Sequence, residues 1–486
     1  IASRGYDGSI GREDYEALGG CENGYLAFDP DNPRYIYGGC YLGLIQEYDR
    51  QTRSTRSIQA YEEFGIGVRP KNSRYRANWN APILVSAHDP KVIYHATQML
   101  LKSADRGFSW SEISPDLTRN EIDKQGEMGR PYNNENIEVY NTIFALAESP
   151  HDPSVLWTGS DDGLIHVTRD GGANWDQVTP KGVGRAMINM IEVSPHDADT
   201  VYAAVHKFKS GDDTPYFYRT TNNGKSWKDI TDGIPDNQYA RVVREDPVRP
   251  GLLYAGTERG LFVSFNRGDN WQSMQLNLPA VPITDLKVQG NDLVMSTQGR
   301  GFWIVDDISP LRQFADAQPG ATVHLYSPAV AYRMVNGNRE GGPEYTSPNP
   351  PAGAVFYYSL DQEPDLKEES LTAEILNEEG QVVRTLTSSE DTGNKGGKGK
   401  KGYALPAQKG INRAVWDLRI DDVTRVPGLY QFGAPPEGAL PGYKLAPGEY
   451  TIRLSLGDQV QEQPLELRWD PNFSYESDRI AAQQEL

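Results

Sequence analysis

The chain has 486 residues, in which 67 acidic side chains outnumber 48 basic ones and leave a net charge of −19. This excess of negative charge excludes a nucleic-acid binder, which needs a basic footprint, and disfavours an anionic membrane surface. No stretch approaches the ~20 consecutive apolar residues of a spanning helix, so we expect no membrane insertion.

The composition indicates many short strands joined by turns, with 48 Gly, 33 Pro and 10% aromatic residues. The first two strands are predicted at 25–28 and 34–38, joined by an Asp- and Pro-rich turn. Folding the chain about this turn brings Cys21 opposite Cys40. Both a cross-strand disulfide and two buried free thiols are compatible with this arrangement.

One unit then recurs: an acidic turn that usually contains Pro, an apolar strand with an aromatic residue, a Gly-rich turn and another short strand. The aromatic residues of five copies, spaced 45 to 63 residues apart, are Tyr37, Tyr94, Trp157, Tyr202 and Tyr254. A weaker copy occupies residues 291–303. Units of about 40–65 residues with four short strands are typical of propeller blades. The sequence therefore predicts a β-propeller with about six blades visible.

A second signature, Ser/Thr-x-Asp/Asn-x-Gly-x-Ser/Asn-Trp, lies downstream in four units. Its copies occupy residues 103–110, 168–175, 220–227 and 264–271. They resemble Asp boxes (BNR repeats), the hairpin turns of sialidases, sortilin-type domains and related propellers. Asx and Gly residues close tight turns, and Trp buries a large surface between neighbouring sheets. We therefore interpret these motifs as structural turns rather than as sugar or metal sites.

The repeated unit does not recur after residue 313. Apolar runs between 320 and 470 predict a separate all-β module with the strand spacing of an immunoglobulin-like sandwich. Within it, the basic stretch 394–402 is interpreted as a solvated loop, with docking of an acidic partner as the alternative. The module order, with GRGFWIVDDISPLRQ at 299–313, resembles bacterial sortilin-like or glycosyl-hydrolase-like secreted repeat proteins.

The predicted fold class is therefore all-β. We expect an irregular lead-in over 1–19, propeller blades over 20–313, the sandwich over 320–470 and a truncated polar tail over 471–486. Further blades upstream of Ile1 are expected to complete a larger ring or a two-propeller protein. The resemblance, together with the possible disulfide, implies an extracellular or periplasmic location.

In a propeller, the innermost strands start near the central channel, and the turns between second and third strands open on the same face. The ligand-binding candidates on that face are Asn80, Asn141, Asn189, Arg241, Arg259 and Arg300. A glycosidase needs two carboxylates about 5–9 Å apart, and the candidates are Asp162, Glu258 and Asp285. The alternative for Asp161 and Asp162 is a charged turn. Three aromatic residues could line a cleft there, and their alternative is packing within the blade: Trp79, Tyr140 and Tyr239.

Other chemistry finds little support. Of His88, His151 and His196, two or three occupy equivalent positions of different units, so they cannot converge on one ion. We therefore predict no metal and no cofactor. The Arg-Ile-Pro signature of sialidases is absent. We expect a non-catalytic scaffold that holds a peptide, protein or glycan at the channel. The alternative is a glycoside hydrolase, of sialidase or endo-glucanase type, and a third hypothesis is an assembly factor.

Overall fold

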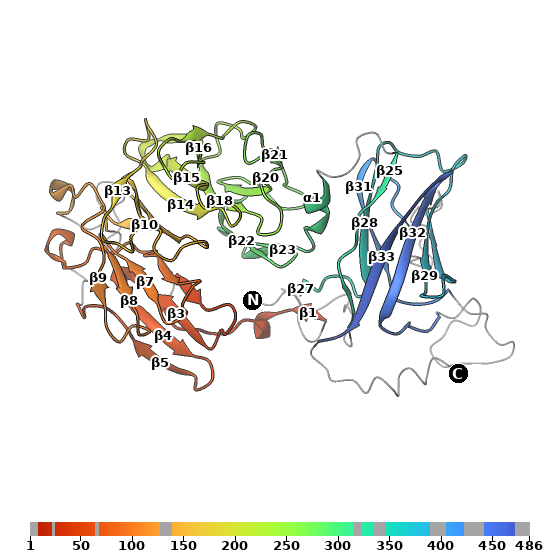
Figure 1. The fold of residues 1–486 in the computed structure, drawn as a ribbon, viewed down its shortest axis with the longest axis horizontal. Coiled ribbons are helices and arrows are strands. Elements are labelled where there is room, and N and C mark those ends of the chain that lie inside the picture. The colour runs from red at the N-terminus through yellow and green to blue at the C-terminus, as the bar shows by residue number, and fades with distance from the viewer. Residues whose placement is uncertain are drawn as a thin grey trace. The chain divides into compact units, whose positions relative to one another are not determined.

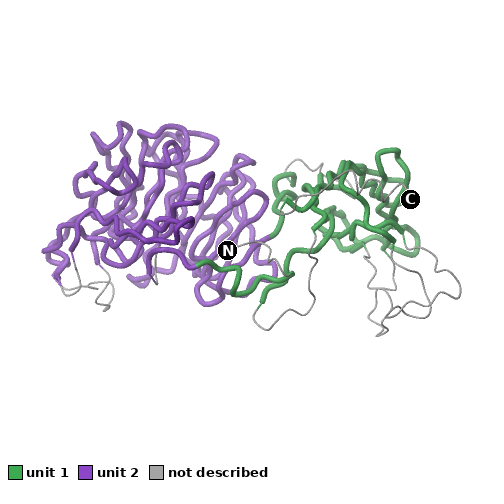
Figure 2. Tube along the Cα trace, turned by 90° about the horizontal axis from the view of Figure 1, so that it is seen from below, with its two compact units in different colours: residues 1–16, 306–486 green, residues 17–305 purple. Residues whose placement is uncertain are grey.

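The computed structural model describes residues 8–21, 25–63, 68–126, 139–314, 322–334, 346–388, 405–421 and 442–471. The chain divides into two compact units, residues 17–305 and residues 1–16 with 306–486 (Figure 2). Nearly all regular structure in the described residues is β-strand, with one short α-helix, α1 (Ser309–Phe314). No helix in this part of the chain is long and apolar enough to cross a membrane.

Residues 17–305 form six antiparallel sheets, in each of which the strands pair in chain order (Figure 1). The first five sheets have four strands and the sixth has three. These sheets are the blades of a β-propeller, and we number them 1 to 6 in chain order.

The strands of the blades are β2 (Leu26–Phe28), β3 (Tyr35–Gly39), β4 (Ile45–Asp49) and β5 (Ser54–Ser57); β6 (Ile83–Val85), β7 (Ile93–Ala96), β8 (Leu100–Ser103) and β9 (Ser111–Glu112); β10 (Ile143–Glu148), β11 (Leu156–Ser160), β12 (Ile165–Thr168) and β13 (Asp176–Gln177); β14 (Met187–Val193), β15 (Val201–Lys207), β16 (Asp212–Thr220) and β17 (Lys228–Asp229); β18 (Ala240–Glu245), β19 (Leu253–Thr257), β20 (Leu261–Ser264) and β21 (Gln272–Ser273); β22 (Ile283–Gln289), β23 (Asp292–Thr297) and β24 (Phe302–Val305).

The second strand of each complete blade carries the repeated aromatic residue, and it is buried in all five. Tyr202, for example, is fully buried and packs with Ala240 and Val243 of blade 5. In blades 2 to 5 such a strand is covered on both faces by other blades, which explains its nearly continuous apolar sequence. The five predicted aromatic positions therefore mark the strands between which the blades pack.

The Ser/Thr-x-Asp/Asn-x-Gly-x-Ser/Asn-Trp turns join the third and fourth strands. In the first copy, the Ser103 hydroxyl accepts a hydrogen bond from the Gly107 amide at 2.7 Å, and the Asp105 carboxylate accepts one from the Ser109 amide at 2.8 Å. The Trp110 indole Nε1–H then donates to the carbonyl of Ile58 in the preceding blade at 2.8 Å. The motif therefore closes its own turn and also binds the neighbouring sheet.

The same inter-blade hydrogen bond recurs in every copy of the turn. The remaining donor and acceptor pairs are Trp175 to Ile113 at 2.9 Å, Trp227 to Val178 at 2.6 Å and Trp271 to Ile230 at 2.7 Å. Each acceptor directly follows the fourth strand of the preceding blade. Blades 1 to 5 are thus joined in sequence by four equivalent contacts.

The second unit contains two packed sheets that share one hydrophobic core. The three-stranded sheet has the order β25-β28-β31, and the five-stranded sheet has the order β26-β33-β32-β29-β30. Their bounds are β25 (Val323–Leu325), β28 (Ala354–Leu360), β31 (Gly410–Trp416), β26 (Ala331–Arg333), β33 (Gln459–Trp469), β32 (Gly448–Leu456), β29 (Leu371–Leu376) and β30 (Val382–Thr387). The unit is therefore a β-sandwich.

The lead-in differs from the expectation of an irregular segment. Strand β1 (Ser9–Ile10) pairs with β27 (Ser347–Pro348), so the first residues belong to the second unit. The sequence prediction missed this strand because a two-residue strand has no periodicity to detect. The predicted basic loop at 394–402 and the tail after residue 471 lie outside the described residues.

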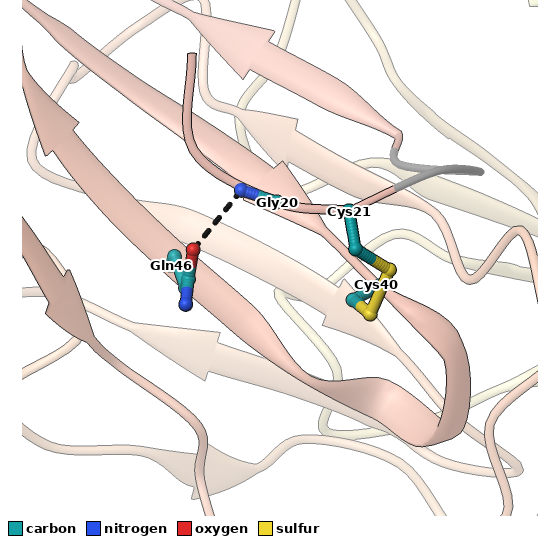
Figure 3. Close-up of a disulfide and its surroundings, with 4 residues drawn as sticks. All are labelled: Gly20, Cys21, Cys40 and Gln46. Carbon is teal, nitrogen blue, oxygen red and sulfur yellow. Dashed lines mark hydrogen bonds between the residues drawn. A yellow bond between two sulfur atoms is a disulfide. The ribbon is translucent and has the colours of Figure 1, made fainter. Parts of the chain in front are cut away.

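A disulfide joins Cys21 to Cys40, with their Cα atoms 5.0 Å apart. It closes the start of blade 1, where the neighbouring Gly20 amide donates to the Gln46 side chain at 3.1 Å (Figure 3). Of the two alternatives that the sequence left open, the structure contains the bonded pair.

Removal of this disulfide tests its contribution to stability. The bond spans 19 residues, and the chain-entropy model gives a loop of this size about 3 kcal/mol. We expect the double variant Cys21→Ser, Cys40→Ser to lose about that free energy of unfolding in the propeller unit. The measurement is urea denaturation followed by tryptophan fluorescence, and unchanged stability would contradict the prediction.

Two adjacent glycines offer a matched test of the inter-blade contact. Both Gly171 and Gly172 have positive φ, 71° and 103°. A Cβ atom on Gly172 would lie 2.4 Å from the Ile113 carbonyl oxygen, whereas a Cβ atom on Gly171 would meet nothing within 4 Å. We expect Gly172→Ala to cost about 2 kcal/mol more than Gly171→Ala, because only the former displaces the preceding blade. Equal losses in denaturant titrations would show that the blades do not meet there.

Candidate functional site

The end of the blades that carries the turns between second and third strands holds most of the predicted site residues. We call it the rim face, and its turns are residues 40–44, 97–99, 161–164, 208–211, 258–260 and 298–301. Since an antiparallel ladder places the end of the second strand beside the start of the first, the residues that precede each innermost strand share this face.

Asp161 lies in the rim turn of blade 3 and is 6% exposed. Its carboxyl group accepts hydrogen bonds from the Thr142 amide at 2.9 Å and the Thr142 hydroxyl at 2.8 Å, and the Asn78 side-chain amide lies 3.4 Å away. Burial, with a smaller contribution from the adjacent Asp162, raises the pKa of Asp161 to about 8. This carboxyl group is therefore mostly protonated at neutral pH.

Asp162 is fully buried beside it. Its carboxylate accepts hydrogen bonds from the Asn141 side chain at 2.6 Å, the Arg119 amide at 2.8 Å and the Ser160 hydroxyl at 2.5 Å. Burial raises the pKa of Asp162, while these donors act in the opposite direction. The structure thus brings two predicted residues, Asp162 and Asn141, together in a buried network that holds the turn.

Arg241 and Glu258 of blade 5 form an ion pair at 2.7 Å on the rim face. Arg241 also donates to the Tyr239 hydroxyl at 2.9 Å, and the Asn189 side chain donates to the Arg241 carbonyl. Tyr239 stacks on Phe208, with the ring centroids 4.7 Å apart. Four predicted residues therefore meet here, namely Asn189, Tyr239, Arg241 and Glu258, and Glu258 is already paired with a cation.

Asp285 lies on β22, the innermost strand of blade 6, and its side chain is exposed. It pairs with Arg244 at 2.9 Å, and Arg244 pairs in turn with Glu192 at 2.6 Å. Burial, followed by the charge of Asp285, raises the pKa of Tyr25 to about 12, which places this tyrosine of blade 1 near the same group. These side chains come from blades 1, 4, 5 and 6 and surround the centre of the ring.

The remaining predicted residues do not join a cluster. Asn80, Arg259 and Arg300 are exposed on three different blades. Of the predicted cleft aromatics, Trp79 is half-buried beside Tyr41, and Tyr140 is buried. The rim face therefore has the exposed amide of Asn80 and the exposed guanidinium groups of Arg259 and Arg300, whereas the Glu258 carboxylate on the same face is already paired.

The sequence analysis missed several partners that define these networks, namely Asn78, Thr142, Glu192 and Arg244. One signal was available: Glu192 and Arg244 pair with the equivalent aromatic residues of their blades, Tyr202 and Tyr254. Opposite charges at the same repeat position of neighbouring innermost strands indicate an ion pair near the channel.

The three repeat histidines do not converge. Each ring Nε2 lies within hydrogen-bond distance of a backbone carbonyl in the next blade: His88 of Ser149 at 2.8 Å, His151 of Ser194 at 3.0 Å and His196 of Asp246 at 2.7 Å. Because a carbonyl can only accept, the Nε2–H donates. Within the described ranges, no group of three or more His, Cys, Asp or Glu side chains could hold a metal ion.

A small pocket lies between blades 1 and 2. Its lining comes from the rim turns of both blades and from their connection, and includes Leu42, Tyr61, Tyr75, Arg76 and His95. Burial lowers the pKa of His95 to about 4, so its ring is neutral at physiological pH.

No protein-family model matches the sequence, and no curated protein matches it either. Solved structures match at low identity. The GH74 enzyme of Niastella koreensis is 13% identical, with a TM-score of 0.43, over 70% of this chain and 51% of that one. YCF48 bound to D1 peptide is 12% identical, with a TM-score of 0.39, over 62% of this chain and 84% of that one. PorZ of the Porphyromonas gingivalis type-IX secretion system is 11% identical, with a TM-score of 0.39, over 93% of this chain and 60% of that one.

The chain thus spans about half the length of the first of these proteins. The six sheets themselves define the fold class as an all-β propeller. At this degree of similarity the neighbours do not assign an activity to the chain.

The raised pKa of Asp161 predicts a pH-dependent stability. Its folded pKa, about 8, lies above the model value of 3.8. Its contribution to stability is therefore present below pH ~4 and is lost as the pH rises through about 8. We expect Asp161→Asn, which stays neutral, to gain stability relative to the parent chain between pH 5 and pH 8.

The measurement is the thermal unfolding midpoint of the propeller unit at both pH values. Asp236→Asn, at an exposed position of the same unit, is the matched control and should follow the parent chain. A constant difference between Asp161→Asn and the parent would show that Asp161 is ionised in the folded protein.

Proposed function

We propose that this chain is a non-catalytic binding scaffold that holds a peptide, protein or glycan on the rim face of its propeller. The observation that carries the proposal is the state of the acids nominated for hydrolysis. Glu258 and Asp285 are ion-paired, and the carboxylate of Asp162 is fully buried with three donors. A glycosidase needs one carboxyl group to protonate the leaving group and another to act on the sugar.

The rim face is suited to recognition instead. Arg259 of blade 5 and Arg300 of blade 6 are exposed there. Blade 5 also carries the Arg241–Glu258 ion pair. Guanidinium groups present fixed forks of donors that match carboxylates, carbonyls and hydroxyls. A ligand can exchange water for these donors without displacing the buried networks beneath them.

Three further assignments belong to this proposal. The Ser/Thr-x-Asp/Asn-x-Gly-x-Ser/Asn-Trp turns are Asp boxes, as in sortilin-like repeat proteins, and the sandwich is immunoglobulin-like. The chain acts in an extracellular or periplasmic compartment, because a structural disulfide persists in an oxidising environment. The Cys21–Cys40 bond supports this location.

Binding and hydrolysis can be separated in one experiment. Peptide and glycan arrays are screened with the chain, and the affinity of the strongest binder is measured for Arg259→Ala, Arg300→Ala and Lys225→Ala. We expect an arginine variant to bind at least about tenfold more weakly, since hydrogen bonds to charged groups contribute about 1.5–3 kcal/mol. Lys225, exposed in a turn at the opposite end of blade 4, is the matched control.

The bound compound is then recovered and its integrity is checked. An intact ligand supports the scaffold. Cleavage that Asp162→Asn or Glu258→Gln abolishes would establish the glycoside hydrolase instead. If no compound binds, or if Lys225→Ala weakens binding as much as the arginine variants, the rim face is not the site.

A further inference from the structure

The side of blade 1 that faces away from blade 2 carries an apolar surface. On β2, Ala27 is buried towards blade 2, whereas Leu26 and Phe28 on the other side are 48% and 47% exposed. Large apolar side chains at adjacent positions of one strand face form a patch rather than scattered surface residues.

The same position is buried in every other blade. In each innermost strand, one residue pairs with the repeated position of the second strand. The residue one position earlier in the innermost strand points to the opposite face of the sheet, away from the next blade. Leu26 is that residue in blade 1. Its equivalents and their exposed fractions are Ile83 2%, Leu146 8%, Ile191 1%, Val243 0% and Leu286 1%. In blades 2 to 5 the preceding blade supplies the covering core residues.

Blade 6 does not have the complementary surface. Its second strand has Val294 where blades 1 to 5 have a buried Tyr or Trp, and Lys287 lies opposite Val294 and is exposed. Its described sheet also stops at three strands. The sixth blade therefore presents a smaller side chain at the position where blades 1 to 5 present a Tyr or Trp.

Part of this side of blade 1 is already covered. A Cβ atom on Gly38 would lie 2.2 Å from the Gly19 carbonyl oxygen, so the lead-in crosses β3 there. The disulfide of Cys21, two residues later, fixes this crossing (Figure 3). The open area is therefore confined to β2.

We propose that this surface of β2 binds one further blade of the same repeat type, supplied by polypeptide outside these 486 residues. That blade would place the aromatic residue of its second strand against Leu26 and Phe28, as Tyr94 does against Leu146 of blade 3. The contact continues the interface that joins blades 1 to 5. This proposal concerns the assembly of the ring and does not depend on the ligand of the rim face.

Hydrogen exchange tests the proposal in two preparations, this 486-residue chain and the natural protein purified from its source. We expect the amides of β2 to exchange at least about tenfold more slowly in the natural protein, because a covering blade removes local opening. The amides of β14, already enclosed between blades 3 and 5, should exchange equally in both. Equal rates in β2 would overturn the proposal, including the case in which the natural protein is no longer than this chain.

Analytical ultracentrifugation tests the alternative, in which a second copy of the chain covers the β2 surface instead of a further blade. We expect the 486-residue chain, Leu26→Asp and the control Leu276→Asp to sediment as monomers. Leu276 follows β21 of blade 5 and is 70% exposed. Leu276→Asp therefore makes the same leucine-to-aspartate change at a different part of the surface. A dimer that only Leu26→Asp dissociates would overturn the proposal in favour of self-association. All variants should retain the parent circular dichroism spectrum, because Leu26 contributes little buried area.

Discussion

The hydrogen bond from each turn tryptophan to a carbonyl of the preceding blade is the interaction on which the rest of this propeller depends. A single blade exposes both of its faces and cannot bury enough apolar surface by itself. The indole fixes the distance and the angle between two sheets at once, because it donates at its edge while its ring fills the gap. The turn glycine, with positive φ and the neighbouring chain against its α-carbon, then leaves no room for a side chain.

This constraint explains why the two ends of the blades differ in character. At the tryptophan end, four turns have nearly the same sequence and the same contacts, since each must fit the blade before it. At the rim end, the turns range from a buried Asp pair to an aromatic stack and an exposed arginine. A repeat that is held at one end leaves the other end open to variation, and a binding surface requires such variation.

The fold could be predicted from the sequence because its signals are local and repeated. The aromatic residue of each unit marks its second strand, and the Gly-to-Trp turn marks the hairpin between its third and fourth strands. The contacts of the rim face are not local: Asn78 meets Asp161, and Glu192 meets Arg244, across blades. The sequence placed Asp162, Glu258 and Asp285 near one another only by face. Its one signal for a pairing was the opposite charge of Glu192 and Arg244 at the same repeat position. Burial of Asp161 was equally hidden, because a charged turn usually points to solvent.

The charges near the channel show what these pairings imply for function. Arg244 lies between Glu192 and Asp285, so the centre of the ring holds an acid–base–acid group rather than free carboxylates. Proton uptake by either carboxylate would weaken its ion pair with Arg244, which opposes a role as a general base. The pairing therefore favours a rigid, preorganised centre. In the proposed scaffold, a ligand would find this centre already ordered before it binds.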